Sequence, residues 1–315
     1  MKHPFTKPGK KSTKNTKTLK PNKSISYKQT VFLMLFASIG LFGASGWYWY
    51  QNVLTNPERI LSGMLDKSLQ TTSVSRNVTQ VGEGNNVNQS VYLSFTPDIK
   101  AQTITKLSEK TATATTTVTT ETIGTPDADY VRYSAVDISG GDAKQNFDSV
   151  LNTWGANKAT ATGQAPAFLN DALFVIVPFG NLNSSQRVAL KNEIRDVNLY
   201  KFQDSKIDFN NGRPYIDYNI GLTPKALVQV LAKYVEMTGV GNADELVPER
   251  YEGAPEIQVQ LRVDLLSRHV RTIQFEGTGR LETYTGYNTK REVTLPTETI
   301  TIDELQSRLT KIEQQ

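Results

Sequence analysis

The longest uncharged apolar run of the chain covers residues 31–50. It ends in a cluster of four aromatic residues, Trp47, Tyr48, Trp49 and Tyr50. A helix rises about 1.5 Å per residue, so such a run spans about 30 Å, the thickness of the hydrocarbon core of a bilayer. The pattern predicts a single transmembrane helix, with the aromatic cluster as a membrane anchor at the outer interface.

Residues 1–30 are polar and basic. They contain nine Lys, and no Asp or Glu occurs before residue 51. A segment with so few apolar residues cannot bury enough surface to fold, which predicts a disordered tail. Lys-rich flanks stay in the cytoplasm, so we expect residues 51–315 on the extracytoplasmic side of the cell membrane. We expect membrane lipids as the partner of the tail; a nucleic-acid-binding tail is the alternative.

A cleaved signal peptide is the alternative to an anchor. Ala44-Ser45-Gly46 resembles a small-residue cleavage site. The apolar run continues through this site into the aromatic cluster, and the basic segment before it is long for a signal peptide, which favours the anchor. Gly40 and Ala44 have the four-residue spacing of close helix contacts, a pattern that suggests self-association through this helix.

Residues 51–315 are patterned like a folded domain that begins with a helix and a run of strands. Asn56 and Pro57 are typical of a helix start, and the apolar residues that follow recur at helical spacing. Segments rich in Val, Ile, Thr and Tyr then predict strands. These strands are expected at 73–81, 87–95, 99–107, 111–122 and 130–138.

The second half of the domain mixes helices and hairpins. The apolar segment 173–179 predicts a buried strand or a loop that faces the interior. Asn211-Gly212 is a strong hairpin signal, and Thr223-Pro224 predicts a helix start. The other expected elements are a short helix at 147–154, a loop at 155–167, a helix from Ser184 or Ser185, strands at 256–265, 269–275, 280–287 and 292–295, and a last helix capped by Thr301 and Glu304.

This order predicts an α+β fold. Neighbouring strands with helices between the groups indicate a curved, half-barrel-like antiparallel sheet covered by helices, placed after a single transmembrane helix. The predicted parts are a cytoplasmic tail at 1–30, the helix at 31–50, and an extracytoplasmic domain at 51–315, with a possible inner boundary near 155–167.

Composition narrows the chemistry. The chain has no Cys, which excludes disulfides, thiolate metal sites, a Cys nucleophile and a lipid-modified Cys. Of the 35 Lys and Arg residues, nine lie in the tail, so residues 51–315 keep 26 against 31 Asp and Glu, a net charge of −5. The basic character of the chain therefore belongs to the tail and does not indicate a nucleic-acid-binding domain.

Catalytic motifs are not apparent. The sequence contains no nucleophile-elbow, phosphate-loop, zinc-protease or EF-hand pattern. His269 is expected to be an exposed turn residue, and Asp127 with Asp129 is better explained by a turn than by a calcium site. We therefore predict no catalytic residue, no metal site, no cofactor and no enzyme.

Five aromatic residues surround the apolar middle of the chain. Core packing explains them most simply, since such residues normally make a core. The functional interpretation is that they line a cavity for an apolar ligand. These candidate ligand-binding residues are Trp154, Phe168, Phe174, Phe179 and Tyr200.

The order of elements resembles that of the LolA/LprG/LppX lipoprotein carrier superfamily. The similarity lies in the strand at Asn211-Gly212-Arg213-Pro214-Tyr215, the Thr223-Pro224 helix, the Val259–Asp264 and Thr272–Glu276 strands around Ser267-Arg268, and the segment Arg280–Pro296. The resemblance implies a half-open antiparallel barrel closed by helices around an apolar cavity, and a role in binding lipid or another apolar molecule. This chain departs from the family in lacking the lipid-modified Cys.

The layout of basic tail, single span and outer α+β domain also resembles bitopic components of conjugation and secretion channels. We therefore hold two hypotheses. The first is a membrane-anchored binding protein for lipid or another apolar ligand. The second is a non-enzymatic interaction or assembly subunit of an envelope complex, which would have protein partners in the envelope.

Anchoring can be tested by the mass of the protein extracted from membranes. If residues 31–50 stay in place as an anchor, we expect the full mass of 35.0 kDa and release from the membrane by detergent but not by high salt. A protein shortened by about 46 residues would instead identify a cleaved signal peptide.

Overall fold

A computed structural model describes residues 41, 45–48, 56–140, 145–158, 167–210 and 212–313. The tail at 1–30 and most of the segment at 31–50 lie outside the described residues, as do Trp49 and Tyr50 of the predicted anchor. Within the described part of the chain, no helix has the length and apolar character needed to cross a membrane. The transmembrane helix and its orientation stay predictions.

The domain at 51–315 contains five α-helices and twelve strands among its described residues. The helices are α2 (Pro57–Ser68), α3 (Ala167–Leu173), α4 (Ser184–Asp196), α5 (Pro224–Thr238) and α6 (Ile302–Glu313). The strands are β1 (Ser73–Val81), β2 (Asn85–Ser94), β3 (Lys100–Lys110), β4 (Ala114–Gly124), β5 (Ala128–Gly140), β6 (Gly155–Lys158), β7 (Lys201–Asn210), β8 (Arg213–Leu222), β9 (Ile257–Asp264), β10 (Val270–Phe275), β11 (Arg280–Thr285) and β12 (Ile300–Thr301).

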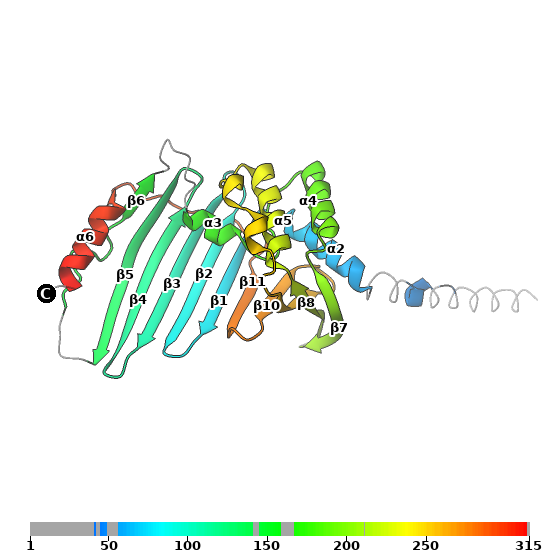
Figure 1. Ribbon diagram of the computed structural model, residues 1–315, viewed down its shortest axis with the longest axis horizontal. Coiled ribbons are helices and arrows are strands. Elements are labelled where there is room, and N and C mark those ends of the chain that lie inside the picture. Colours follow the sequence, from blue (N-terminus) through cyan, green and yellow to red (C-terminus); the bar gives the residue numbers. More distant parts are fainter. Residues whose placement is uncertain are drawn as a thin grey trace, which may run out of the picture. The chain divides into compact units, whose positions relative to one another are not determined.

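All twelve strands belong to one sheet with the order β12-β6-β5-β4-β3-β2-β1-β11-β10-β9-β8-β7. Every pair is antiparallel except β12 with β6. Two meanders, β1–β5 and β7–β11, meet where β1 pairs with β11. The sheet is curved and unclosed (Figure 1), which confirms the predicted α+β class and the half-open antiparallel sheet.

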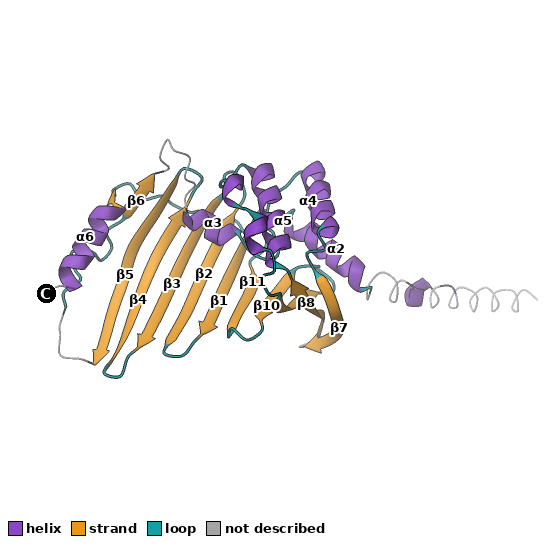
Figure 2. Cartoon of the chain, viewed as in Figure 1, coloured by secondary structure: helices purple, strands orange, loops and turns teal. Residues whose placement is uncertain are grey.

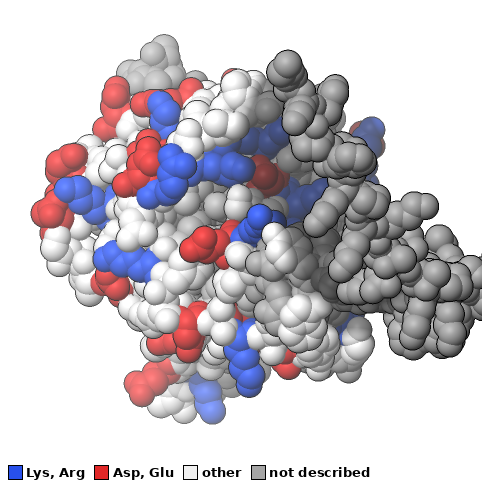
Figure 3. Space-filling model, turned by 90° about the vertical axis from the view of Figure 1, so that its right-hand side faces the viewer, with Lys and Arg blue, Asp and Glu red and all other residues white. Residues whose placement is uncertain are grey.

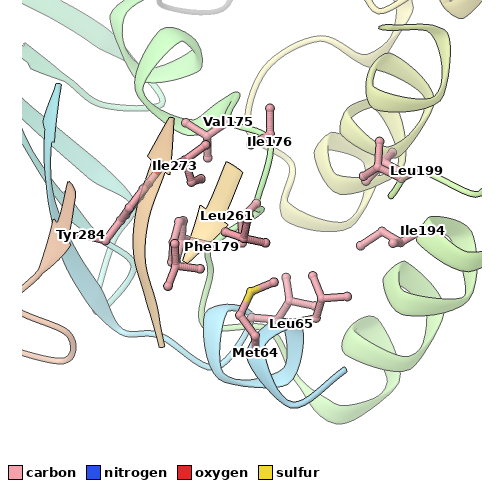
Figure 4. Close-up of a cluster of buried hydrophobic side chains, with 14 of the residues drawn as sticks. Met64, Leu65, Val175, Ile176, Phe179, Ile194, Leu199, Leu261, Ile273 and Tyr284 are labelled. Carbon is pink, nitrogen blue, oxygen red and sulfur yellow. The ribbon is translucent and has the colours of Figure 1, made fainter. Parts of the chain in front are cut away.

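The main core lies where α2, α4 and α5 pack on the β7–β11 half of the sheet (Figure 2). Figure 4 shows side chains from α2, α4, the chain after α3 and the strands gathered in this core. Met64, Ile273 and Leu199 are fully buried there. Burial of one such side chain stabilises the fold by about 1.5–3 kcal/mol.

The predicted helix starts are explained by their caps. The Asn56 side chain accepts a hydrogen bond from the Arg59 N–H at 3.0 Å, and Pro57 occupies the first turn. The Thr301 hydroxyl accepts from the Glu304 N–H at 3.1 Å. The helix expected from Ser184 is capped one residue earlier, by Asn183, which forms a capping box with Gln186.

Two predicted elements are wrong. Residues 147–154 do not form a helix, because Leu151 instead pairs with Tyr133 at the sheet edge and the Asn152 N–H donates to the Tyr133 carbonyl. Residues 292–295 do not form a strand, and Val293 packs on the sheet through Tyr92 and Ile123. In both places contacts made by distant residues override the local pattern.

Two other segments refine the predictions. Residues 173–179 end α3 and continue as a buried loop, so the interior-loop alternative is the correct one. Within the segment 155–167, which was expected to be a loop, residues 155–158 form β6 and Ala167 begins α3. The strand predicted from the Thr-rich tract at 111–122 is confirmed as β4.

Candidate ligand site on the inner face of the sheet

One face of the sheet, here called the inner face, carries the core and the candidate site. Because side chains alternate along a strand, Val74, Leu93 and Ala101 share this face as direct cross-strand neighbours in β1, β2 and β3. All three are buried. The same face of β8–β11 packs on the helices of the main core. The inner face is therefore covered over β8–β11 and around Val74, Leu93 and Ala101.

Further along β2–β5 the inner face carries an apolar row. The row consists of Val87, Leu107, Val118 and Val136, which are direct partners across four strands. Leu107 is 39% exposed, and the other three are half-buried. Figure 1 shows no described helix in front of this part of the sheet. Four aligned apolar residues thus form a surface open to solvent.

Helix α3 forms a roof over the inner face next to this row. Its position depends on Gly124, because a Cβ atom there would lie 2.6 Å from the backbone nitrogen of Leu169. Beside it, the buried Asp129 carboxylate accepts a hydrogen bond from the Phe168 N–H at 3.1 Å. Gly124 and Asp129 are themselves cross-strand partners, so one point of the sheet holds the start of α3.

A cavity of about 300 Å³ lies between α3 and the sheet. Its floor consists of inner-face side chains from β1–β5, and α3 supplies its roof. The lining combines four threonine hydroxyls and one amide with four apolar side chains, an arginine and a carboxylate. The lining residues are Arg76, Gln89, Val91, Thr103, Thr105, Thr120, Thr122, Val131, Phe168, Asp171 and Ala172.

Arg76 is the unusual member of this lining. Its side chain is 4% exposed, and its Nε and Nη1 atoms make no hydrogen bond with any described residue. The nearest carboxylate oxygen is Glu282 Oε2, which is 4.0 Å from Arg76 Nη1. A guanidinium carries five N–H donors, and a buried donor without a partner is costly.

Glu282 is already occupied by other donors. Its Oε1 accepts from Arg280 Nε at 2.9 Å, and its Oε2 accepts from the Tyr284 hydroxyl at 2.5 Å. Burial, followed by the charge of Glu282, raises the pKa of Tyr284 well above its ordinary value, so this hydroxyl remains a donor. Two arginines therefore share one buried carboxylate, and the cluster has a net positive charge beside the cavity.

The carboxyl of Asp129 also has a shifted pKa. Burial raises the pKa of this carboxyl from 3.8 to about 6, against the lowering effect of hydrogen bonds from α3. The more exposed Asp171, on the roof, adds a like charge to it, and the pKa of Asp171 is itself raised by burial. The attachment of α3 therefore includes a carboxylate that burial disfavours in its ionised form.

Four of the five aromatic residues proposed from sequence lie on the inner side of the sheet. Phe168 lines the cavity. Phe179 stacks on Tyr284 with ring centroids 5.2 Å apart, and the buried Tyr200 hydroxyl donates to the Ile176 carbonyl at 2.8 Å. Phe174 is half-buried against the same core.

Trp154 is not brought together with these four. It belongs to a small cluster with Tyr92 and Ile123, which point to the opposite face. The Arg132 guanidinium lies 4.6 Å from the centroid of its ring. Phe179 and Tyr200 pack inside the main core, and of the five, Phe168 is the one that lines this cavity.

His269 differs from the expected exposed turn residue. Its ring is stacked on Tyr287 with centroids 4.0 Å apart, and it is half-buried. Burial lowers the pKa of this imidazole, with a further lowering by the charge of Arg271. Over the described part of the chain, no three His, Asp or Glu side chains gather as a metal site.

The chain was compared with known proteins by sequence and by structure. No protein-family model matches the sequence, and no curated protein matches it. Among solved structures, the crystal structure of LprF from Mycobacterium bovis is similar over 77% of this chain and 99% of LprF, with 12% identity and a TM-score of 0.39.

The contribution of Asp129 to the stability of the fold should depend on pH. With its pKa raised in the folded state, Asp129 stabilises the fold fully below about pH 4, and this contribution is lost as the pH rises through about 6. Asp129→Asn should therefore match the wild-type protein near pH 3.5 and be more stable at pH 7.5, by on the order of 2–3 kcal/mol. Urea unfolding at several pH values measures the difference.

The matched control for this experiment is Asp127→Asn, which changes an exposed carboxylate in the same turn. We expect a small effect without the same pH dependence. A difference between Asp129→Asn and wild type that is constant from pH 3.5 to 7.5 would contradict the role assigned to burial.

The cluster of Arg76, Arg280 and Glu282 predicts different effects on stability when its acid and its buried arginine are replaced. Glu282→Gln leaves Arg76 and Arg280 buried or half-buried without a counter-charge, and should lower the free energy of unfolding by about 3–5 kcal/mol. Arg76→Met removes the donors that lack partners, and should leave stability unchanged or raise it. Thermal unfolding of both variants tests this, and an equal loss in the two would show that Arg76 is a structural partner of Glu282.

Proposed function

We propose that the chain is a membrane-anchored, extracytoplasmic binding protein for a lipid or another largely apolar molecule. The observation that carries this proposal is the apolar row Val87, Leu107, Val118 and Val136, which is aligned on the inner face and open to solvent. Aligned apolar side chains on a rigid sheet are a surface on which an acyl chain gains contact area. The row leads directly into the cavity under α3.

The opposite face of the same strands supports this assignment by contrast. At the corresponding positions β3 and β4 carry Lys106, Thr117 and Thr119, which face solvent or are half-buried. An ordinary solvent-facing sheet surface has this polar character. The apolar row therefore distinguishes the inner face from the outer one at equal distance from the core.

The proposed location follows from the acid-free basic tail and the apolar run at 31–50. On the side of the domain shown in Figure 3, acidic and basic side chains are interspersed. With a net charge of −5 for residues 51–315, electrostatic attraction of nucleic acid is not a favoured role. Membrane lipids are the partner proposed for the tail and the anchor.

The proposal does not include catalysis. The polar groups of the cavity are hydroxyls, one amide, one arginine and one carboxylate on the roof. This set lacks a nucleophile paired with a base in hydrogen-bond contact, which covalent catalysis requires. Binding is what the set supports.

Substitution on the two faces of β3 tests the proposal. Leu107 on the inner face and Ile104 on the outer face are 39% and 41% exposed. A protease site is inserted at residues 51–55 of the full chain, so that cleavage releases the domain that follows from the membrane. Native mass spectrometry of the released wild-type domain should then show a bound lipid-like mass, which Leu107→Glu should reduce at least tenfold, because a charge in an acyl-binding surface costs more than the ~1.4 kcal/mol that a tenfold change represents.

Ile104→Glu is the matched control and should keep the bound mass, since it changes the same strand with equal exposure on the other face. Circular dichroism spectra of both variants check that the fold is retained. A wild-type domain that carries no ligand and binds no acyl probe would contradict the proposal, as would equal losses in the two variants.

A further inference from the structure

The cavity under α3 is lined by one buried cation, Arg76, whose neighbouring carboxylate is shared with a second arginine. Arg76 and Arg280 share Glu282, and both oxygens of that carboxylate already accept shorter hydrogen bonds from Arg280 and Tyr284. The carboxyl of Asp171 also lines the cavity, on the roof, where it is exposed to solvent. The Nε and Nη1 donors of Arg76 remain without partners in a buried place.

We propose that Arg76 binds the anionic head group of an amphiphilic ligand, a carboxylate or a phosphate, inside this cavity. The inference rests on the proposed function and adds the chemical class of the ligand. A guanidinium presents parallel N–H donors that match the oxygens of these anions, and such charge-assisted pairs are about twice as strong as neutral hydrogen bonds. The head group would supply the counter-charge and the acceptors that Arg76 lacks.

The rest of the cavity fits an oxyanion as well. Thr103, Thr105 and Thr122 place hydroxyl groups on the floor, and such groups donate hydrogen bonds to anionic oxygens. Gln89 lies on the neighbouring strand, and its Nε2, which donates to Thr105 Oγ1 at 3.3 Å, carries a second N–H. A cation would meet Arg76 at close range and is disfavoured by like charge.

The positions of the cavity and the apolar row also determine which end of the ligand lies where. Gln89 and Thr105 of the cavity are each two residues away from Val87 and Leu107, respectively, along the same face of β2 and β3. A spacing of two residues in a strand is about 6.6 Å. An amphiphile with its head group at Arg76 would therefore lay its apolar chain across the row.

Photocrosslinking with a pair of probes tests the head group. The full chain is reconstituted in phosphatidylcholine nanodiscs and exposed to a diazirine-labelled palmitic acid, or to the alcohol with the same labelled chain. Crosslinks are mapped by mass spectrometry to peptides of β2–β5, which separates them from crosslinks in the anchor. We expect the carboxylate probe to label these peptides at least tenfold more than the alcohol.

Variants of Arg76 test whether this residue binds the head group. Arg76→Met should reduce labelling by the carboxylate to the level of the alcohol, and Arg76→Lys, which keeps the charge but loses the forked donors, should give an intermediate yield. Arg132→Met is the matched control, because Arg132 pairs with Glu121 on the opposite face. It should leave labelling by both probes unchanged.

The outcomes separate this inference from the proposed function. Equal labelling by acid and alcohol in the wild-type protein would overturn the anionic head group and leave apolar binding in place. Labelling of β2–β5 by neither probe would overturn the proposed function itself. Binding of inorganic phosphate that is lost in Arg76→Met, together with equal labelling by acid and alcohol, would overturn the head-group assignment and identify a free oxyanion as the ligand.

Discussion

The contact of α3 with the sheet at Gly124 is the one on which the candidate site depends. A side chain larger than hydrogen at this point would meet the Leu169 backbone, so the helix would have to move away from the strands. With the helix in place, Arg76 is enclosed and the inner-face threonines become a cavity floor. With the helix displaced, the same residues would be an open, half-polar sheet surface. The site is therefore a product of one close backbone approach, fixed further by the hydrogen bond between Asp129 and the Phe168 N–H.

The buried polar groups around this contact lower the stability of the fold compared with apolar side chains at the same places. Arg76 is buried with donors that lack partners, and Asp129 carries a pKa raised to about 6 by burial. Neither group is needed to hold the main core, which consists of aliphatic and aromatic side chains. Costly buried polar groups beside a cavity are typical of binding sites, because a ligand can satisfy them. The main core supplies the stability that allows them to persist.

The sequence predicted the fold class well and the site poorly, for physical reasons. Alternation, the Asn56-Pro57 start and the Asn211-Gly212 turn act locally, so they identified most strands and helices. Residues 147–154 and 292–295 were assigned wrongly because partners distant in the chain decide their conformation. For the site, aromatic residues were selected by type, which found Phe168 and missed Arg76. Arg76 stands between Val74 and Val78 at a two-residue spacing, and this charged residue in an otherwise apolar face of a strand was the available signal.

Charge places a constraint on how an anionic amphiphile would reach this site. Residues 51–315 carry a net charge of −5, so at distances beyond the Debye length the domain does not attract an anion. The attraction of Arg76 acts at short range within a buried cavity, where salt screens it little. Capture would therefore begin with the apolar chain on the row of Val87, Leu107, Val118 and Val136, and the head group would find Arg76 afterwards. In this order the hydrophobic contact provides most of the affinity and the arginine provides the selection among ligands.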